Sequence, residues 1–178
     1  MNGEVNKQNL RYWSQENPHW LLGDKQQGAQ HIMLWCGICN GQFFGPFFFS
    51  DTVNGETYLN MLENELTPAL SILNGRTIWF MQDGAPAHYA TSVQKWLNVN
   101  FPYKWIGRRV PVEWAPRSPD LNPLDFALWG YLKAQVYKVK IRDLHHLQKQ
   151  IESECSNIDP DNASLSCGQH EFASPKVY

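Results

Sequence analysis

Two short acidic motifs contain the residues of this chain that are best suited to chemistry. The first, residues 82–88, places Asp83 directly after an apolar, β-rich stretch at 77–81. The second, residues 118–125, ends at Asp125 and leads into an apolar helical stretch. A carboxylate at the end of a strand, facing another in the first turn of a helix, can hold a divalent metal ion for phosphoryl transfer. We find no third carboxylate on a strand upstream of these two.

Each acid also has an ordinary structural interpretation. Asp83 followed by Gly84 favours a turn, and spacing alone leaves the turn and the metal ligand evenly balanced. With Asn122 as the N-cap, Asp125 becomes the third helical residue, where an acid stabilises a helix by roughly 0.3–1 kcal/mol without any catalytic role. His88 could orient a phosphate or a carboxylate, or it could cap the next helix.

The basic residues nearest to these motifs are Arg108 and Arg109, which follow Trp105 and Gly107 in a connecting segment. They are candidates for phosphate contacts, although a solvated loop would have the same composition. The net charge of −2 and the pI near 6.3 do not indicate a nucleic-acid-binding protein. Attraction to DNA would have to come from such local patches, or from metal ions held by carboxylates.

Length and composition indicate one globular domain, because the chain has 178 residues and is 43% hydrophobic. The first residues contain no apolar leader, and the longest apolar stretch, at 43–49, is interrupted by Gly45 and Pro46. That stretch is too short to cross a bilayer, so we expect a soluble, intracellular chain with no membrane partner.

Cys36 and Cys39 have the spacing of redox and zinc sites. They lie in a strand-like run, where positions three apart point to opposite faces, so their sulfurs should not converge. We therefore expect buried core cysteines and not a thioredoxin-like or zinc protein.

Hydrophobic periodicity and turn residues predict the elements that must position these side chains. The expected order begins with a strand at 31–38, a tight turn at Asn40-Gly41, a strand at 42–49 and a helix through 58–73. A strand at 77–82, a helix at 88–99, a short strand at 112–114 and helices at 123–137 and 142–154 follow. Pro68 should bend or shorten the helix at 58–73. Residues 156–178 lose this periodicity and are expected to form an irregular tail. The order indicates an α/β fold in which helices cover a mixed sheet.

Several motifs together resemble the catalytic domain of mariner-type DNA transposases. They are QDGAPAH at 82–88, WAPRSPDLNPLD at 114–125 and LWG at 128–130. RYWS at 11–14, VNGETYL at 53–59 and WIGRR at 105–109 are similar to the insect branch of that superfamily. Residues 1–155 are accordingly identified as part of such a catalytic domain.

The resemblance implies a ribonuclease-H-like fold in which three acids hold two magnesium (or manganese) ions. The ions activate water, or a DNA 3′-hydroxyl, for in-line attack on a phosphodiester. Asp83 would be the second acid and Asp125 the third, while His88, Arg108 and Arg109 would contact nucleic acid. The implied partners are DNA and a second copy of the chain, in the nucleus, with no small-molecule substrate.

The first acid of such domains ends their first, central strand, just before the segment that residues 2–3 resemble. Glu4, Asp24 and Asp51 are not credible substitutes for it. We therefore expect a truncated domain that lacks the first central strand and is inactive as a nuclease. The alternative is a non-catalytic module for nucleic-acid binding or dimerisation, because residues 3–30 resemble a segment that reaches a partner subunit.

Overall fold

The computed structural model describes residues 31–39, 41–73, 75–115, 122, 124–158 and 172–177, with the backbone alone at 126–127 and 172–177. Its strands are β1 (Met33–Cys39), β2 (Gln42–Phe49), β3 (Phe80–Met81), β4 (Trp105–Ile106) and β5 (Phe172–Val177). Its helices are α1 (Gly55–Met61), η2 (Leu62–Leu66), α2 (Thr67–Leu70), η3 (Ser71–Leu73), α3 (Thr91–Asn100), η5 (Leu124–Leu128), α4 (Trp129–Val136) and α5 (Leu144–Ser156). The interpretations of residues 1–30, Glu4 and Asp24 among them, lie outside these ranges.

The sheet is built on the predicted hairpin of β1 and β2. The two strands pair antiparallel from Cys39 opposite Gln42 to Met33 opposite Phe49. Gly41 has a φ of 71°, the left-handed conformation that a tight hairpin turn requires. On the other edge of β1, strand β5 pairs antiparallel, while β3 and β4 form a separate parallel pair.

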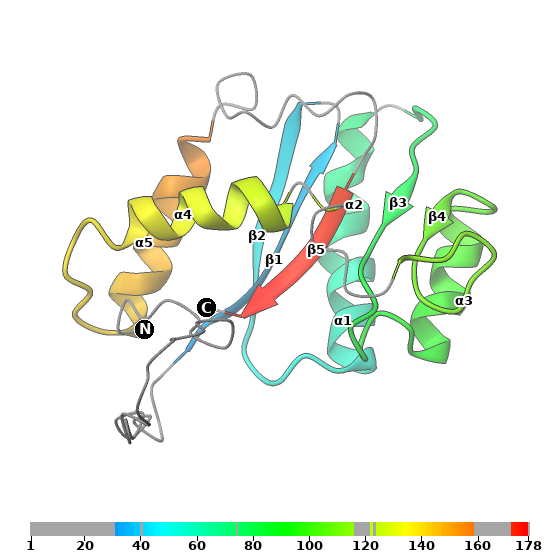
Figure 1. The fold of residues 1–178 in the computed structure, drawn as a ribbon, viewed down its shortest axis with the longest axis horizontal. Helices are drawn as coiled ribbons and strands as arrows, with labels where there is room; N and C mark the ends of the chain where they lie inside the picture. Colours follow the sequence, from blue (N-terminus) through cyan, green and yellow to red (C-terminus); the bar gives the residue numbers. More distant parts are fainter. Residues whose placement is uncertain are drawn as a thin grey trace, which may run out of the picture.

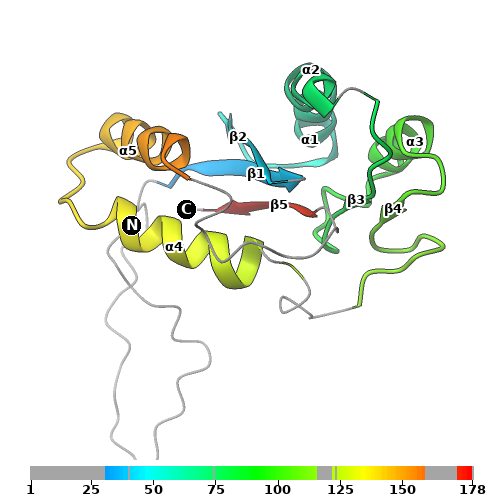
Figure 2. The same cartoon turned by 90° about the horizontal axis from the view of Figure 1, so that it is seen from above.

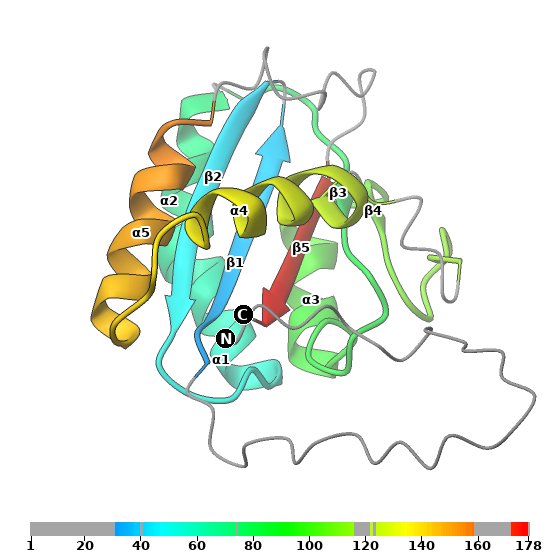
Figure 3. The same ribbon diagram turned by 60° about the vertical axis from the view of Figure 1, so that its left-hand side comes forward.

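Helices cover both faces of the strands, as the α/β pattern predicts (Figures 1 and 2). In Figure 3, α4 crosses in front of β1 and β5, and α1, α2 and α3 lie behind them. Two hydrophobic cores result, one on each face. Trp35 and Cys39 belong to the core against α1 and α3, whereas Leu34 and Cys36 belong to the core against α4 and α5. Cys36 and Cys39 are buried on opposite faces, which confirms their interpretation as core residues.

The helix predicted through residues 58–73 is one continuous run of helical segments with a strong N-terminal cap. The Asn54 side chain accepts hydrogen bonds from the backbone N–H groups of Glu56 and Thr57, and Thr57 caps Asn54 in return. Pro68 does not end the helix. The wider η2 turn precedes it, and in that turn the Thr67 hydroxyl donates to the Leu62 carbonyl over 2.7 Å.

Two predicted strands and one predicted connecting segment differ from the structure. The strand expected at 77–82 is reduced to Phe80–Met81, and the one expected at 112–114 is a single bridge between Gly107 and Glu113. The partner of β3 is instead Trp105–Ile106, which the sequence pattern places in the connecting segment.

The irregular tail predicted for 156–178 is wrong for Phe172–Val177, which forms β5. This strand depends on the open edge of β1, a tertiary partner that local periodicity does not show. Within the described ranges, no helix is long and apolar enough to cross a membrane.

Candidate active site

Asp83 lies just beyond the C-terminal end of β3. The backbone N–H of Gln82 donates to the Ile106 carbonyl and so continues the parallel pairing up to this point. The Asp83 Oδ1 atom accepts the Ala85 backbone N–H over 2.9 Å, which closes a turn of the type that Asp favours. The turn interpretation is therefore correct, and it fixes the direction of a carboxylate that remains 36% exposed.

His88 holds the same carboxylate from the buried side. Its Nδ1 atom lies 2.6 Å from Asp83 Oδ1 and 3.2 Å from the Asp83 carbonyl oxygen. The imidazole is 1% exposed, and its centre lies 4.6 Å from that of the Tyr58 ring. Of the roles considered for His88, orientation of a carboxylate agrees with this geometry. A direct nucleic-acid contact does not, because the ring is buried, and α3 has no side-chain cap.

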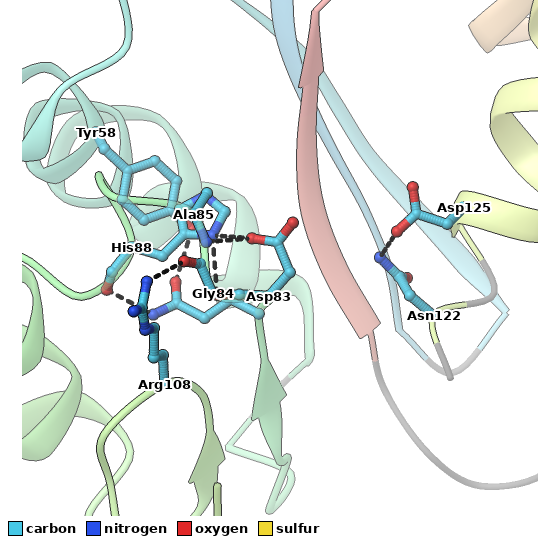
Figure 4. Close-up of polar contacts among 9 residues, drawn as sticks. Tyr58, Asp83, Gly84, Ala85, His88, Arg108, Asn122 and Asp125 are labelled. Atoms are coloured by element: carbon cyan, nitrogen blue, oxygen red, sulfur yellow. Dashed lines mark hydrogen bonds and ion pairs between the residues drawn. The ribbon is translucent and has the colours of Figure 1, made fainter. Parts of the chain in front are cut away.

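A buried polar chain supports this arrangement from behind (Figure 4). The Tyr58 hydroxyl donates to Gln82 Oε1 over 3.0 Å, and Gln82 Nε2 donates to the His88 carbonyl over 2.8 Å. Burial raises the pKa of Tyr58, and the charge of Asp83 raises it further, so the phenol stays protonated and donates. The sequence analysis predicts no role for Tyr58 or Gln82. The position of Gln82 directly after a buried strand could have indicated one, because a buried Gln side chain requires polar partners.

Asp125 lies in the first turn of η5 and is oriented by Asn122. The Asn122 side chain donates from Nδ2 to Asp125 Oδ2 over 2.9 Å and accepts the Leu124 backbone N–H over 3.1 Å. Asn122 is 2% exposed, so this capping arrangement is locked in the core. The predicted N-cap is confirmed, and it directs Asp125 instead of excluding a further role for it.

The two acids lie on opposite sides of β5. This strand contacts β3, after which Asp83 follows, and η5, which contains Asp125. Figure 4 shows β5 passing between the two carboxyl groups. Within the described ranges, no group of three His, Cys, Asp or Glu side chains is placed to hold a metal ion.

Arg108 and Arg109 lie beside the loop that contains Asp83. Their guanidinium carbons lie 4.5 Å and 5.4 Å from the centre of the Tyr89 ring, and Arg108 Nη1 donates to the Gly84 carbonyl over 3.4 Å. A Cβ atom at Gly84 would lie 3.2 Å from the Arg108 side chain. The absence of a side chain at Gly84 therefore allows Arg108 to pack closely against the loop. The phosphate role of both arginines stays a prediction.

Proteins that perform metal-dependent phosphoryl transfer combine an α/β sheet with an acid at a strand end and an acid at a helix start, and both features are present here, with two arginines beside the first acid. Comparison with known families makes this class specific. Residues 6–148 match the family of DDE superfamily endonucleases, and the chain belongs to that family.

Individual relatives agree with this assignment. The chain is 33% identical over 127 residues to the Tc3 transposase of Caenorhabditis elegans, covering 71% of this chain and 36% of the relative. It is 26% identical over 138 residues to the Tcb2 transposase of Caenorhabditis briggsae, covering 76% and 47%. The chain thus spans about half or less of the length of these relatives. The resemblance to mariner-type transposases is confirmed, whereas its insect-like branch stays a prediction.

The fold is also similar to that of solved transposase structures. The catalytic domain of Mos1 mariner transposase matches with a TM-score of 0.59 at 21% identity, over 72% of this chain and 64% of that one. A Mos1 transposase paired-end complex with the left transposon end matches with a TM-score of 0.55 at 21% identity, over 85% and 44%. The predicted ribonuclease-H-like fold is confirmed. The position between β1 and β3, where a strand is expected to be missing, is held here by β5.

Proposed function

We propose that this chain is part of a DNA transposase catalytic domain, in which Asp83 and Asp125 are two of the acids that hold magnesium or manganese. The observation that carries the proposal is the fixed, partly exposed Asp83 carboxylate at the end of β3, across β5 from Asp125. The reaction would be cleavage of a DNA phosphodiester followed by strand transfer, in the nucleus.

The residues present fit a divalent metal in part. Carboxylate oxygens are the ligands that magnesium prefers, and each acid is oriented by its own donor, His88 for Asp83 and Asn122 for Asp125. When bound, the metal would polarise the phosphate and acidify the attacking hydroxyl. Arg108 and Arg109 would hold the flanking phosphates beside Asp83.

The metal proposal is tested by thermal unfolding with and without millimolar magnesium or manganese. We expect the metal to raise the Tm of the wild-type chain, because a ligand that binds the folded state stabilises it against unfolding. Asp83→Asn and Asp125→Asn each remove a proposed ligand, so the metal should not raise the Tm of these variants. Glu152→Gln, an exposed acid on α5, is the matched control and should keep the effect. A wild-type Tm that does not respond to metal would refute a site at the acid pair.

We further propose that the 178-residue chain does not cleave DNA by itself, because no group of three possible metal ligands forms among the residues that the structure describes. A nicking assay on supercoiled plasmid with manganese should show no activity above that of Asp83→Asn and Asp125→Asn. Robust cleavage that both substitutions abolish would overturn this proposal and would show a complete active site.

The alternative is a non-catalytic module that binds nucleic acid, and the exposed arginine pair on Tyr89 is the observation that favours it. Replacing Arg108 and Arg109 by Ala should weaken DNA binding and reduce the slope of log K against log salt by about one for each phosphate that is no longer neutralised. Lys149→Ala on α5 removes one exposed charge elsewhere and serves as the control. If the wild type and all variants bind DNA with equal affinity, the surface formed by Arg108 and Arg109 is not a DNA-binding site.

We also propose that the chain forms a homodimer, and light scattering in solution would test its oligomeric state.

A further inference from the structure

A cavity of about 410 Å³ lies where the first helical run, the segment before β3 and the end of α3 meet. Leu70 of α2, Ile78 before β3 and Phe101 after α3 are among the side chains that line it. Sites for small organic ligands have volumes of about 300–1,000 Å³. The cavity is therefore large enough to bind such a ligand.

This cavity lies at the end of the β3–β4 pair that is opposite to Asp83. Two of its lining residues, Ile78 and Lys104, come shortly before β3 and directly before β4. The backbone N–H of Phe80 donates to the Lys104 carbonyl over 2.9 Å, so the parallel pairing begins at this end. Asp83 follows the other end of β3. The cavity is therefore separate from the candidate active site.

Two aromatic side chains line the cavity. The ring centres of Trp96 and Phe101 lie 6.0 Å apart, with an angle of 57° between the ring planes. Phe101 is 7% exposed and also packs on Phe80, whose ring centre lies 5.2 Å away. Trp96 is only half-buried, so part of its indole is accessible from the cavity. A flat ring that enters the cavity would pack on these aromatic side chains and be stabilised by stacking in addition to burial.

Two cations, Arg76 and Lys104, line the same cavity. Tight turns place both of them. The Arg76 backbone N–H donates to the Leu73 carbonyl over 3.1 Å, and that of Lys104 donates to the Phe101 carbonyl over 3.0 Å. In the second turn Tyr103 has a φ of 61°, the left-handed conformation that favours glycine. The chain thus adopts a strained turn that brings Lys104 back to the cavity lined by Phe101.

The surrounding protein does not neutralise these two charges. The described residues that line the cavity include no Asp or Glu, and neither cation forms an ion pair within the described ranges. A phosphate monoester carries a charge of about −1.5 to −2 at pH 7 and has three strong acceptor oxygens. Two unpaired cations would balance that charge, and the guanidinium of Arg76 is well suited to phosphate. The cavity is therefore complementary to a flat ring that carries a phosphate.

We propose that this cavity binds a nucleoside 5′-monophosphate, with the base packed on Trp96 and Phe101 and the phosphate held by Arg76 and Lys104. The nucleobase supplies the flat ring, and the monophosphate supplies the negative charge. A free nucleotide and the 5′-phosphorylated end of a DNA strand both have this chemistry. The site is additional to the one proposed at the acid pair and does not depend on it.

Calorimetric titration of the full chain with adenosine 5′-monophosphate (AMP) tests the proposal. EDTA keeps divalent ions out of any site at the acid pair, so the result does not depend on the proposed metal role. We expect saturable binding of AMP, at least about tenfold tighter than that of adenosine or ribose 5-phosphate, because each fragment lacks one of the two contacts. No binding at millimolar AMP, or equal binding of either fragment, would refute the proposal.

A 5′-phosphorylated oligonucleotide and its unphosphorylated counterpart distinguish the two sources of this chemistry. If AMP binds and the phosphorylated strand binds about tenfold tighter than the unphosphorylated one, the cavity accepts a DNA end. If AMP binds and the two strands bind equally, the ligand is a free nucleotide.

Removing either cation should weaken the binding of AMP. Arg76→Gln and Lys104→Gln should each reduce the affinity by about tenfold, because each removes a charged donor to the phosphate. Lys149→Gln, which removes an exposed charge on α5, is the matched control and should leave the affinity unchanged. Equal affinities of all three variants would show that AMP does not bind in this cavity.

Filling the cavity should block binding without changing its charge. Ser71 is exposed and lines the cavity, so Ser71→Trp places a large side chain inside it. Ser92→Trp places the same side chain at an exposed position of α3 that does not line the cavity, and it should bind AMP like the wild type. Circular dichroism checks that both variants are folded. A folded Ser71→Trp chain that binds AMP as tightly as Ser92→Trp would overturn the proposal.

Photolabelling of the wild-type chain gives a second measurement that needs no substitution. An azido analogue of AMP, irradiated in the presence of the chain, should modify peptides from residues 67–78 or 96–104, and excess AMP should prevent the labelling. Peptide mass spectrometry identifies the modified segments. Labelling confined to other segments, or labelling that AMP does not reduce, would refute the site.

Discussion

At the scale of single residues, the site depends on side chains that hold the acids more than on the acids themselves. Asp83 is fixed by His88 and by its own turn, and His88 is fixed in turn by Gln82 and Tyr58. All three supporting side chains are buried. The loop that contains Asp83 should therefore be rigid before any ligand arrives, which lowers the cost of binding a metal or phosphate.

The pair Tyr58 and Gln82 should be energetically coupled. Tyr58→Phe leaves Gln82 Oε1 without its donor, and Gln82→Leu leaves the Tyr58 hydroxyl buried without an acceptor. Each change should cost about 1–3 kcal/mol in the free energy of unfolding. The double variant should be less destabilised than the sum of the two by at least about 0.5 kcal/mol. Urea unfolding of the four proteins measures this, and strict additivity would refute the coupling.

Acid should remove part of the stability that Asp143 gives to the start of α5. The His146 backbone N–H donates to the Asp143 carboxylate over 2.7 Å, and this bond lowers the pKa of Asp143 below its ordinary value near 3.8. Since the folded pKa is the lower one, the contribution is complete above the ordinary value and is lost as pH falls through the lowered pKa. The ordinary pKa of an aspartate is about 4. Below that pH, the Tm of Asp143→Asn should therefore depend less on pH than the Tm of the wild type. Parallel curves would contradict the assignment.

At the scale of elements, the position of α1 is set by close approach to the segment before α3. A Cβ atom at Gly55 would lie 2.5 Å from the Cβ of Ala90, at the junction where α1 packs against α3. Tyr58 projects from this helix to Gln82, so the packing of α1 also determines how the buried polar chain reaches Asp83.

Two glycines should respond oppositely to the same substitution. Gly55→Ala should destabilise the fold, because α1 or the segment at Ala90 must shift to remove the clash. Gly130→Ala, in exposed helix with no neighbouring atom within 4 Å, should stabilise it by about 0.5–1 kcal/mol. Thermal unfolding compares the two, and a Gly55→Ala variant as stable as Gly130→Ala would show that the contact is not tight.

At the scale of the whole molecule, β1 belongs to both hydrophobic cores. Its alternate residues face α1 and α3 on one side and α4 and α5 on the other. A disturbance in either core is therefore transmitted to the strand that both share, which favours a single cooperative unfolding transition.

Truncating one buried leucine in each core tests this cooperativity. Leu62→Ala and Leu132→Ala should each cost about 2–5 kcal/mol in the free energy of unfolding. In both variants, tryptophan fluorescence and far-ultraviolet circular dichroism should report the same urea midpoint. Separate midpoints for the two probes would show that the cores unfold independently.

The sequence predicts the local features of this molecule well and the long-range ones poorly. The hairpin, the Asn122 cap and the opposite faces of Cys36 and Cys39 follow from turn chemistry and strand alternation, and the structure confirms them. The burial of His88 against Asp83 is one of several roles that the sequence leaves open, because only the packing of Tyr58 decides it. Strand β5 could not be predicted, because its partner is far away in the sequence and its own residues have no periodicity.

The pairing of β1 with β5 has a consequence for how the protein folds. Strand β1 obtains its first partner, β2, from the adjacent part of the chain and its second, β5, from residues 172–177, far away in the sequence. During synthesis the hairpin can therefore form early, while its other edge stays open until residues 172–177 have left the ribosome. Folding should be slow in its final step, and a chaperone that covers exposed strand edges would raise the yield of the native protein.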